Sequence, residues 1–374
     1  METDSKVTRP KIATNEYYMR RTLQLAHKGT GMTSPNPMVG AVIVKDGQII
    51  GRGYHKRYGD KHAELNAIEN AKEDLRGSVL YCNLEPCCHT DKQTPPCTTP
   101  ILQSGIGRVV IGTLDPNPTV DGKGIQLLRE HGVDVQVGLL ENECRRLNEV
   151  YFKYIQTGFP FVTIKYAQTL DGRIATRGGQ SQWISSTSSL KYAHHLRTIN
   201  SCMMVGIRTV IQDNPRLTVR LAKGNHPIPV IVDSTLRISP DARVFQNPSH
   251  PIIATTQKAN IKKMADIQQL GAKILVIQEN PQGQVDLSQL LQQLGEEKTS
   301  SVLVEGGSGI ITSLLRERLA DKMVVCIAPK LLGTGLEAVG DLGVSRLCQA
   351  IQLSDMAMTR MGDDFILEGR IKEE

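Results

Sequence analysis

Aromatic residues are scarce in this sequence, and long apolar runs are missing. Phe, Tyr and Trp together make up 4% of the chain, with a single tryptophan. No run of 18 apolar residues is present, as a membrane-spanning helix would require. Residues 1–13 are polar and lack the apolar core of a secretory signal. Lys and Arg form no run that suggests a nucleic-acid tract. We therefore expect neither a membrane nor a nucleic-acid partner.

What remains is the composition of an ordinary globular protein. The 374 residues, 40% hydrophobic and 22% charged, are enough for two domains with separate cores. The net charge of +6 is a mild excess that suits a small phosphorylated molecule. Eight cysteines without regular spacing indicate free thiols in a reducing compartment, so we expect a cytoplasmic protein.

The first half alternates between expected strands and helices. Residues 39–44 and 48–53 should form a hairpin, because Asp46-Gly47 between them is a strong turn signal. The other elements that we expect are helix 15–27, a helix from His62, strand 79–82, a helix from Cys97, strand 108–112, helix 124–131, strand 133–137 and helix 141–156. A hairpin followed by strand–helix–strand units predicts a mixed sheet covered by helices.

The segment Thr157-Gly158-Phe159-Pro160 interrupts this pattern, so we place a domain boundary there, with domains 1–157 and 158–374. The second domain starts with strand 161–166 and helix 188–198. Further strands are expected at 202–205, 230–232, 252–255, 273–276, 301–304 and 323–327, with helices between most of them. This alternation predicts a second α/β sheet with crossover connections.

Three short segments together contain the residues of a catalytic zinc site: His62-Ala63-Glu64, Glu85-Pro86-Cys87 and Pro95-Pro96-Cys97. His62, Cys87 and Cys97 are three zinc ligands, and a catalytic zinc keeps its fourth position for water. Glu64 is expected to carry protons rather than to bind the metal. Zinc-dependent nucleobase deaminases divide these roles in the same way.

The spacing of the two cysteines differs from the usual deaminase signature, in which two residues separate them. Here Cys97 has to return to the metal after the loop 88–96. A proline precedes each cysteine, and proline is well tolerated in the first turn of a helix, so we expect Pro86 and Pro96 each to open a helix. The metal would then lie near helix N-termini, where the dipole favours thiolates.

Other interpretations of these residues remain open. Cys88 and His89 are rival ligands, and a structural zinc would take one of them as a fourth ligand and exclude water. A deaminase of nucleic-acid bases is a second alternative, and it needs a basic channel with aromatic residues. Cys82 is expected in the core, and inert buried thiols are expected at Cys144, Cys202, Cys326 and Cys348.

A candidate phosphate site lies in the second domain. The buried strand that ends at Val304 is followed by Glu305-Gly306-Gly307-Ser308-Gly309 and then by an apolar run typical of a helix. A strand, a glycine turn and a helix start present backbone N–H groups to an anion. The segment is not a G-x-G-x-x-G motif, so it does not predict a Rossmann fold. From the residues alone, a cofactor site and a plain tight turn both remain possible.

With these motifs in view, the chain resembles the bifunctional riboflavin-biosynthesis deaminase/reductase family over nearly its full length. The motifs that carry the resemblance, beside the zinc segments, are Ser34-Pro35-Asn36-Pro37-Met38-Val39-Gly40, Thr94-Pro95-Pro96-Cys97, Asp115-Pro116-Asn117-Pro118, Ser181-Gln182-Trp183-Ile184, Asp213-Asn214-Pro215-Arg216-Leu217-Thr218-Val219-Arg220, Glu305-Gly306-Gly307 and Ala328-Pro329-Lys330-Leu331-Leu332-Gly333. The chain departs from the family pattern in a Cys87–Cys97 loop that is one residue longer, with Cys88 in place of the usual serine.

The resemblance implies an α/β protein of two domains and two consecutive reactions. The N-terminal domain would be a cytidine-deaminase-like mixed sheet between helices that removes the C2 amino group of a diaminopyrimidinone ribosyl phosphate with Zn²⁺. The C-terminal domain would be a dihydrofolate-reductase-like sheet that uses NADPH to reduce the ribosyl group to ribityl. The partner is thus a small phosphorylated pyrimidine, and the family likeness also implies a homo-oligomer.

For the deaminase, the resemblance implies that His62, Cys87 and Cys97 bind zinc and that Glu64 is the catalytic proton carrier. It implies that substrate is bound by Asn36, His55, Asp115 and Asn117. The residues alone favour turn chemistry for Asn36 and Asn117, since each precedes a proline.

For the reductase, the resemblance implies substrate contacts at Lys165, Ser181, Arg197, Leu217, Arg220 and Glu305. It implies NADPH contacts at Ala167, Trp183, Thr209, Asp213, Ser234, Gly307, Ser308, Gly309, Ile310, Ile311, Thr312 and Ser313. Two arginines suit a phosphate, which guanidinium binds bidentately; solvated surface charge is the alternative for both, and core packing is the alternative for Trp183. Lys165 and Glu305 are both candidates for the proton donor.

Overall fold

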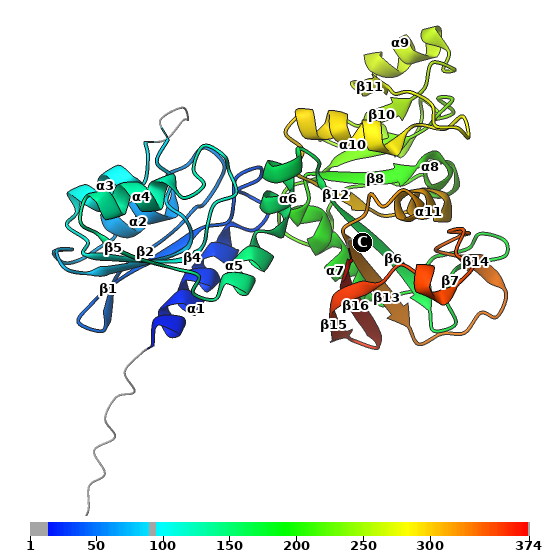
Figure 1. Cartoon of the computed structure of the whole chain (residues 1–374). Coiled ribbons are helices and arrows are strands. Elements are labelled where there is room, and N and C mark those ends of the chain that lie inside the picture. The colour runs from blue at the N-terminus through cyan, green and yellow to red at the C-terminus, as the bar shows by residue number, and fades with distance from the viewer. Residues whose placement is uncertain (1–13, 90–94, 373–374) are drawn as a thin grey trace, which may run out of the picture. The chain divides into compact units, whose positions relative to one another are not determined.

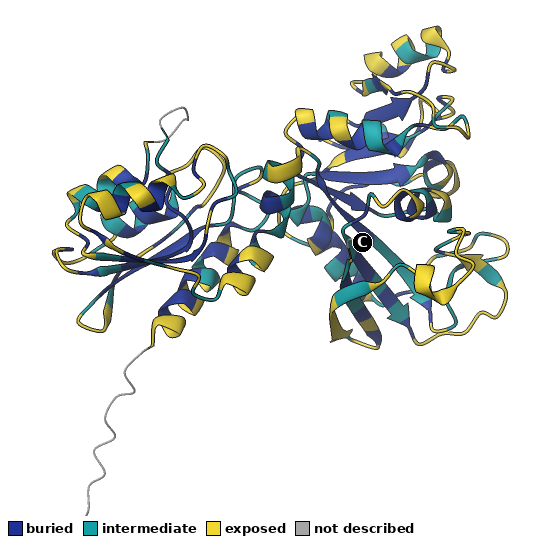
Figure 2. Cartoon of the chain, in the orientation of Figure 1, coloured by how far each residue is buried: buried dark blue, intermediate teal, exposed yellow. Residues whose placement is uncertain are grey.

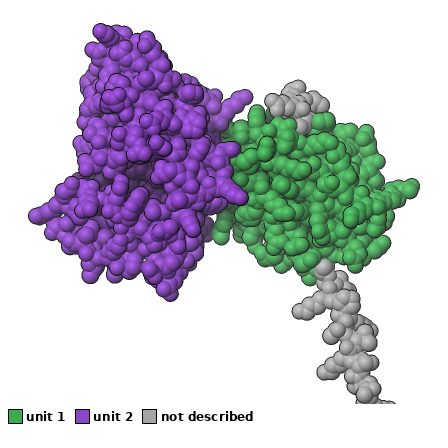
Figure 3. Space-filling view, turned by 180° about the vertical axis from the view of Figure 1, so that it is seen from behind, with its two compact units in different colours: residues 1–156 green, residues 157–374 purple. Residues whose placement is uncertain are grey.

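The structure is a computed structural model that describes residues 14–89 and 95–372. The chain forms two compact units, Met1–Gln156 and Thr157–Glu374 (Figure 3). This division falls one residue before the boundary expected from the sequence. The polar N-terminus 1–13 and Thr94 of the cysteine loop lie outside the described residues. Each unit has its own sheet and core, and each is described by itself.

A mixed five-stranded sheet forms the centre of the first unit (Figure 1). Its strands are β1 (Gly40–Lys45), β2 (Gln48–Tyr54), β3 (Val79–Leu84), β4 (Arg108–Thr113) and β5 (Asp134–Val137). In the order β2-β1-β3-β4-β5, β1 is antiparallel to both neighbours, and β3, β4 and β5 are parallel. The expected hairpin is confirmed: Asp46 and Gly47 both have positive φ, the turn geometry that Asp-Gly favours.

Helices cover both faces of this sheet. They are α1 (Asn15–Ala26), α2 (Ala63–Glu69), α3 (Thr98–Gln103), α4 (Lys123–Glu130), α5 (Glu141–Leu147) and α6 (Glu149–Thr157), with a 3₁₀ turn at His27–Gly29. Helices α2, α3 and α4 lie on one face, and α1 and α5 on the other (Figure 1). Because side chains alternate along a strand, Ala41 and Ile43 join the first core and Val42 and Val44 the second.

The single helix expected at 141–156 is wrong, because the chain breaks into α5 and α6 at Asn148. The Asn148 side chain accepts the backbone N–H of Met38 at 2.8 Å and donates to the Met38 carbonyl at 3.0 Å. Asn148 itself leaves helical geometry, with φ −108°. The break places α6 and its Tyr151 against the core under α2–α4.

A nine-stranded sheet forms the centre of the second unit. Its strands are β6 (Phe161–Thr169), β8 (Cys202–Gly206), β9 (Ile228–Val232), β10 (Ile252–Thr255), β11 (Lys273–Val276), β12 (Ser301–Val304), β13 (Lys322–Ala328), β15 (Leu353–Met361) and β16 (Asp364–Ile371). The order is β11-β10-β9-β8-β12-β6-β13-β16-β15. All pairs from β11 to β13 are parallel, whereas β16 is antiparallel to β13 and β15.

Helices again cover both faces, so the buried strands lie between exposed helix surfaces (Figure 2). They are α7 (Thr187–Ile199), α8 (Ile207–Asp213), α9 (Ile261–Gln269), α10 (Leu287–Glu296) and α11 (Ser308–Arg316), with 3₁₀ turns at Arg243–Gln246 and Leu347–Gln349. Side chains of α10 and α11 pack with Met204 and Val302 on one face. Those of α8 and α9 pack with Met203 on the other. No helix in the described ranges is long and apolar enough to cross a membrane.

The second unit also contains elements that the sequence analysis missed. Strands β15 and β16 form a hairpin at one edge, and β7 (Arg173–Thr176) pairs with β14 (Gly335–Glu337) in a separate two-stranded sheet. Cys82, Cys144, Cys202 and Cys326 are buried as expected. Cys348 is exposed, because it lies in the short 3₁₀ turn rather than under a helix, so its prediction as a buried thiol is wrong.

Candidate active sites

The three expected zinc ligands meet at one point of the first unit. His62 is the residue before α2, Cys97 the residue before α3, and Cys87 lies in the loop after β3. Their ligand atoms lie close together: His62 Nδ1 is 3.4 Å from Cys87 Sγ and 3.2 Å from Cys97 Sγ, and the two sulfurs are 3.3 Å apart. The sulfurs are too far apart for a disulfide, whose bond is about 2.0 Å.

These separations fit a zinc ion. Three ligands at tetrahedral angles and usual bond lengths around zinc lie about 3.5 to 3.8 Å apart, a few tenths more than observed here. In the described residues, the cluster of possible ligand atoms consists of His62, Cys87 and Cys97 alone. One imidazole and two thiolates leave the fourth position open, the donor set of a catalytic rather than a structural zinc.

Glu85 holds the loop that carries Cys87. Its carboxylate accepts four backbone N–H groups, those of Asp115, Gly122, Gly124 and Ile125, at 3.0 to 3.3 Å, around the N-terminus of α4. A carboxylate at a helix N-terminus is stabilised by the orphan donors and by the dipole.

The expectation that Pro86 opens a helix is wrong, because the chain after it stays irregular through residue 89. Cys97 returns to the ligand cluster as expected. It directly precedes α3, and its backbone N–H donates to Cys87 Sγ at 3.4 Å. Two helix N-termini, those of α2 and α3, therefore border the ligand cluster instead of three.

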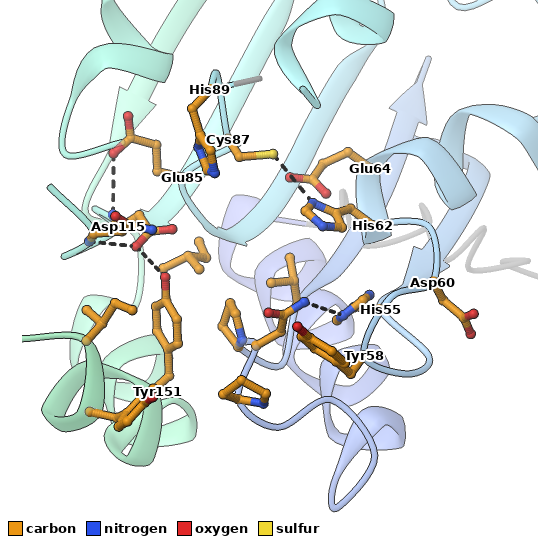
Figure 4. A pocket seen from close by; sticks show the side chains of 18 of the residues that line it. His55, Tyr58, Asp60, His62, Glu64, Glu85, Cys87, His89, Asp115 and Tyr151 are labelled. Carbon is orange, nitrogen blue, oxygen red and sulfur yellow. Dashed lines mark hydrogen bonds between the residues drawn. The ribbon is translucent and has the colours of Figure 1, made fainter. Parts of the chain in front are cut away.

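Glu64 lies beside this cluster in the first turn of α2 (Figure 4). It is 3% exposed, and in the described part of the chain its Oε2 atom has no hydrogen-bond partner. Burial, and next the charge of Cys87, raise the pKa of the Glu64 carboxyl above its usual value. A buried carboxylate oxygen without a hydrogen-bond partner destabilises the fold unless a ligand or water donates the missing hydrogen bond. Glu64 therefore has the environment of a group that exchanges protons.

The ligand cluster opens into a cavity of about 350 Å³ in the first unit (Figure 4). The four expected substrate residues, Asn36, His55, Asp115 and Asn117, all line it. Asn36 Nδ2 and His55 Nε2 are 3.3 Å apart, and His55 Nδ1 is 3.2 Å from the Lys61 carbonyl oxygen. Asn117 also does turn chemistry: its Oδ1 accepts the Thr119 N–H and hydroxyl.

Asp115 is a buried carboxyl on the wall of this cavity. Its Oδ1 accepts the hydroxyl of Tyr151 at 2.8 Å and the backbone N–H of Asn117 at 2.9 Å. Burial raises the pKa of Asp115 to about 6, although both hydrogen bonds act to lower it. Its charge therefore changes close to neutral pH.

The second unit has a cavity of about 360 Å³ at the carboxyl ends of three adjacent parallel strands, β12, β8 and β9. Ligands of open α/β sheets bind at this edge. The glycine turn before α11 forms one wall with Gly307 and Gly309, and the start of α8 contributes Thr209. Ser234, after β9, lines the same cavity.

A buried ion pair lies elsewhere in this unit. Both guanidinium nitrogens of Arg197 that face Glu305 donate to its carboxylate, Nε to Oε1 at 2.8 Å and Nη2 to Oε2 at 2.7 Å. Burial alone would raise the pKa of Glu305, but Arg197, with Lys165 adding to it, lowers the pKa to about 2. His194 beside the pair accepts the Arg220 N–H at 3.0 Å, and burial and the two arginines lower its pKa to about 4.

Both units are similar to known proteins. Residues 12–113 match the cytidine and deoxycytidylate deaminase zinc-binding region, and residues 160–367 match the RibD C-terminal domain. The chain is 42% identical to the riboflavin biosynthesis protein RibD of Aquifex aeolicus over 94% of this chain and 96% of that one. It is 38% identical to RibD of Escherichia coli over 94% and 98%.

The chain belongs to the RibD family, the bifunctional deaminase/reductases of riboflavin biosynthesis. Solved structures are equally similar: RibD of Acinetobacter baumannii (TM-score 0.86, 33% identity, 96% and 99% covered) and the deaminase/reductase of Thermotoga maritima (TM-score 0.82, 38% identity, 96% and 98% covered). The expected fold and enzyme class are thereby confirmed, and so are the two cofactors of RibD proteins, zinc and NADPH.

The expected reductase residues divide between those that line the cavity of the second unit and those that lie outside its lining. Of the NADPH set, those that line the cavity are Thr209, Ser234, Gly307, Gly309, Ile310 and Ser313. The other expected NADPH contacts do not line it: Ala167, Trp183, Asp213, Ser308, Ile311 and Thr312. Nor do the expected substrate contacts: Lys165, Ser181, Arg197, Leu217, Arg220 and Glu305.

Particular environments differ from the sequence-based alternatives. Trp183 is 61% exposed instead of packed in the core. Arg197 is not a solvated surface charge, because its guanidinium is largely buried in an ion pair with Glu305. Leu217 is buried with its backbone at φ 56°, and its carbonyl accepts the Asn247 side-chain amide at 3.2 Å.

The sequence analysis missed several residues of the RibD cavities. Tyr58, Asp60, Tyr151 and Tyr154 line the first cavity. Tyr151 contacts Asp115 from another helix, 36 positions along the chain, and no local motif signals that contact. In the second cavity the missed residues with side-chain chemistry are Arg208, Thr235, Arg237, Asn280 and Gln284.

Proposed function

We propose that the first unit removes the C2 amino group of 2,5-diamino-6-ribosylamino-4(3H)-pyrimidinone 5′-phosphate, and that the second then reduces the ribosyl group with NADPH. The product is 5-amino-6-ribitylaminouracil 5′-phosphate. The similarity to the T. maritima protein, a diaminohydroxyphosphoribosylaminopyrimidine deaminase/5-amino-6-(5-phosphoribosylamino)uracil reductase, supports these substrates. We assign the deaminase to residues 1–157 and the reductase to residues 158–374.

In the deaminase, His62, Cys87 and Cys97 hold the zinc. When bound, zinc would lower the pKa of its water and so supply a hydroxide nucleophile. Glu64 would take one proton from that water and pass it to the pyrimidine ring nitrogen; it would then take the proton of the hydroxyl group added at C2 and give it to the amino group, which leaves as ammonia when the C–N bond breaks. The orphan Oε2 atom of Glu64 beside the ligand cluster supports this role and is the observation that carries the proposal.

The cavity walls bind the pyrimidine and its ribose. Asn36 and His55 form one polar pair, and Asp115 with Tyr151 forms another. Amide, imidazole and carboxyl groups offer donors and acceptors for a ring edge and for sugar hydroxyls. Asn117 orders the turn that follows Asp115, and its backbone N–H fixes the Asp115 carboxylate, so it acts partly through its neighbour.

Two alternatives lose support. A structural zinc needs a fourth protein ligand, but in residues 14–89 and 95–372 the cluster holds three residues, without Cys88 or His89. A nucleic-acid deaminase needs cations along its strand channel, whereas no Lys or Arg lines the first cavity in that same part of the chain.

In the reductase, NADPH binds at the carboxyl edge of β12, β8 and β9, with its pyrophosphate on the glycine turn before α11. The substrate is bound by Lys165, Ser181, Arg197, Leu217, Arg220 and Glu305, and Arg197 also donates to the Thr218 carbonyl beside Leu217 at 2.9 Å. Glu305, with a pKa of about 2, stays ionised at neutral pH. We therefore assign proton donation to Lys165, the other candidate.

One assay tests both reactions. Under anaerobic conditions, ammonia release and NADPH oxidation are followed separately on the diaminopyrimidinone substrate and on its deaminated product, with and without a zinc chelator. We expect the chelator to stop ammonia release and to leave reduction of the deaminated product unchanged. If reduction of that product also stops, the two sites are not independent and the assignment is wrong.

Two further parts of the proposal concern the whole chain. A cytoplasmic location is supported by its eight cysteines, none of which forms a disulfide in the described residues. A homo-oligomer is supported by the edge strand β15, which exposes Met356 and Met358. Light scattering after size-exclusion chromatography measures the stoichiometry, and a monomer at micromolar concentration contradicts it.

A further inference from the structure

We propose that two histidines, His194 and His226, position the segment of the reductase that presents Arg220 to the substrate. The inference rests on the proposed function, in which Leu217 and Arg220 contact the substrate, and it adds the residues that hold these contacts in place. The observation behind it is that the two imidazoles accept the backbone N–H groups of two consecutive residues, Val219 and Arg220.

The segment 214–227 joins α8 to β9 and forms no helix or strand. In the described part of the chain, no hydrogen bond between backbone groups reaches residues 216–220. Leu217 nevertheless lies there with φ at 56°, a conformation that a residue other than glycine keeps only where its surroundings hold it. The shape of this segment therefore depends on the side chains that hydrogen-bond to its backbone.

Two side chains from outside the segment donate to its carbonyl groups. Asn247 is buried, and its Nδ2 donates to the Arg216 carbonyl at 3.1 Å and to the Leu217 carbonyl at 3.2 Å. The Arg197 guanidinium on α7 donates to the Thr218 carbonyl at 2.9 Å. The first three residues of 216–220 are thus held through their carbonyl oxygens.

Two imidazoles hold the next two residues through their N–H groups. His226 Nδ1 accepts the Val219 N–H, and His194 Nδ1 accepts the Arg220 N–H, each at 3.0 Å. His226 belongs to the same segment, whereas His194 is a buried residue of α7. His194 therefore ties the backbone of Arg220 to a packed helix, and His226 keeps the preceding residue in register with it.

The surroundings of His194 keep it a hydrogen-bond acceptor. The charged groups that act on it are those of the proposed substrate contacts, Arg197, Arg220, Glu305 and Lys165. Burial, and next the two arginines, lower the pKa of His194 to about 4. The imidazole is therefore neutral near pH 7, and a neutral ring has a nitrogen that can accept, whereas the protonated ring has none.

The side chain of Arg220 differs from its backbone. Residues 217–219 are buried, but Arg220 is exposed, and within residues 14–89 and 95–372 its guanidinium makes no ion pair or hydrogen bond. Only the backbone of Arg220 is fixed, so its guanidinium is left available for the substrate. A segment released from the histidines would have to be ordered again when substrate binds, which weakens binding rather than hydride transfer.

The test separates the acceptor nitrogen from the bulk of the side chain. Asparagine has its Oδ1 as many bonds from Cβ as histidine has its Nδ1, so His194→Asn and His226→Asn keep an acceptor, whereas His194→Leu and His226→Leu remove it. Reduction of the deaminated product is measured at saturating NADPH, and the NADPH dissociation constant by titration calorimetry. We expect each leucine variant to raise KM roughly tenfold, since it leaves a backbone N–H unpaired, and each asparagine variant to recover most of the loss. The kcat and the NADPH dissociation constant should change by less than about threefold.

Controls separate the possible outcomes. His195→Leu removes an exposed histidine of the same helix and should leave all three values unchanged. His226 is only partly buried, so its variants carry the test if His194→Leu folds poorly. An unchanged KM in either leucine variant that folds, equal losses in kcat and NADPH affinity, or asparagine variants no better than leucine variants overturn the inference. A wild type that does not reduce the deaminated product instead overturns the proposed function.

Discussion

Each unit of the chain has a glutamate in its candidate site, Glu64 in the first and Glu305 in the second, and the two are in opposite states. Glu64 in the first unit keeps an oxygen without a hydrogen-bond partner among the described residues, and burial raises its pKa. Glu305 in the second unit has both oxygens on the Arg197 guanidinium, and its pKa falls to about 2. Glu64 is 3% exposed and the Glu305 side chain 11%, so water reaches little of either, and the Arg197 guanidinium is the largest influence that lowers the pKa of Glu305.

The difference explains why the two carboxylates suit different work. A carboxyl group whose pKa is raised by burial is better suited to take and return protons than one held ionised by a partner. A carboxylate locked in a bidentate ion pair keeps its charge and its place, so it positions its surroundings and exchanges no proton. The sequence predicts the proton-carrying role of Glu64, whereas for Glu305 it leaves proton donation and substrate binding both open.

The largest expected effect comes from removing the proton carrier. Glu64→Gln keeps the shape of the side chain but cannot move protons, so deamination should fall at least about 10³-fold. Zinc content and reduction of the deaminated product should stay as in the wild type. Glu69→Gln on the same helix is the matched control, since it removes only an exposed ion pair with Lys61. Ammonia release well above a thousandth of the wild-type rate in Glu64→Gln would contradict the role.

Removing the metal should affect only one of the two units. Cys97→Ser takes away one of three ligands, so bound zinc, measured by elemental analysis, should drop far below one per chain and deamination should be lost. Cys348→Ser changes an exposed thiol and should retain the metal. Unchanged zinc content in Cys97→Ser would show that another residue completes the site.

How far the sequence predicts the first site follows from its chemistry. His62, Cys87, Cys97 and Glu64 are predictable because zinc catalysis restricts both residue type and spacing, and the fold only has to close the loop. Tyr151 is not predictable, because it reaches Asp115 only after Asn148 breaks a helix that the apolar pattern presents as continuous.

The second unit is less predictable from sequence, for a physical reason. Its cavity is lined by residues from several separate segments, and of these only the glycine turn after β12 carries a recognisable sequence pattern. Arg197 and Glu305 are both predicted from family resemblance as substrate contacts, yet their mutual ion pair joins residues 108 positions apart. The hairpin β15–β16 escapes prediction altogether, since half of its side chains face solvent and lack a clear apolar alternation.

Removing the charge of Glu305 from its ion pair with Arg197 should lower the free energy of unfolding and leave proton transfer in the deaminase unaffected. Glu305→Gln leaves the Arg197 charge buried and unpaired, which typically destabilises by about 3 to 5 kcal/mol. The lowered pKa means that the pair stabilises the folded state above the ordinary carboxyl pKa and stops doing so as pH falls toward about 2. Urea unfolding at pH 7 measures the loss, and the deaminase rate should be preserved. If Arg197→Met with Glu305→Gln is no more stable than the single variant, the unpaired charge is not the cause.

Asp115 should have a smaller effect on stability, and its pH dependence should have the opposite sign to that of Glu305. Its pKa of about 6 lies above the ordinary value, so the folded state favours the protonated form. Asp115 therefore makes its full contribution to the free energy of unfolding below the unfolded pKa near 4. That contribution, up to about 3 kcal/mol, is lost as the pH rises through about 6. Asp115→Asn should flatten that part of the pH dependence, measured by denaturant unfolding between pH 4 and 8. An unchanged pH slope would show that Asp115 titrates normally.

The smallest effect concerns the partner of that carboxyl. The Tyr151 hydroxyl donates to Asp115 Oδ1 and holds its pKa lower than burial alone would. Tyr151→Phe removes the donor, so the Asp115 pKa should rise further above about 6. The midpoint in the pH profile of the deaminase KM should then move up by roughly half a unit to one unit, while kcat changes less than about threefold. Tyr58→Phe, on the same cavity wall, should leave the midpoint in place. A midpoint that moves down in Tyr151→Phe would mean that the hydroxyl stabilises the protonated form of Asp115. The hydrogen bond from Tyr151 would then not act on Asp115 as the ion pair with Arg197 acts on Glu305, which it keeps ionised.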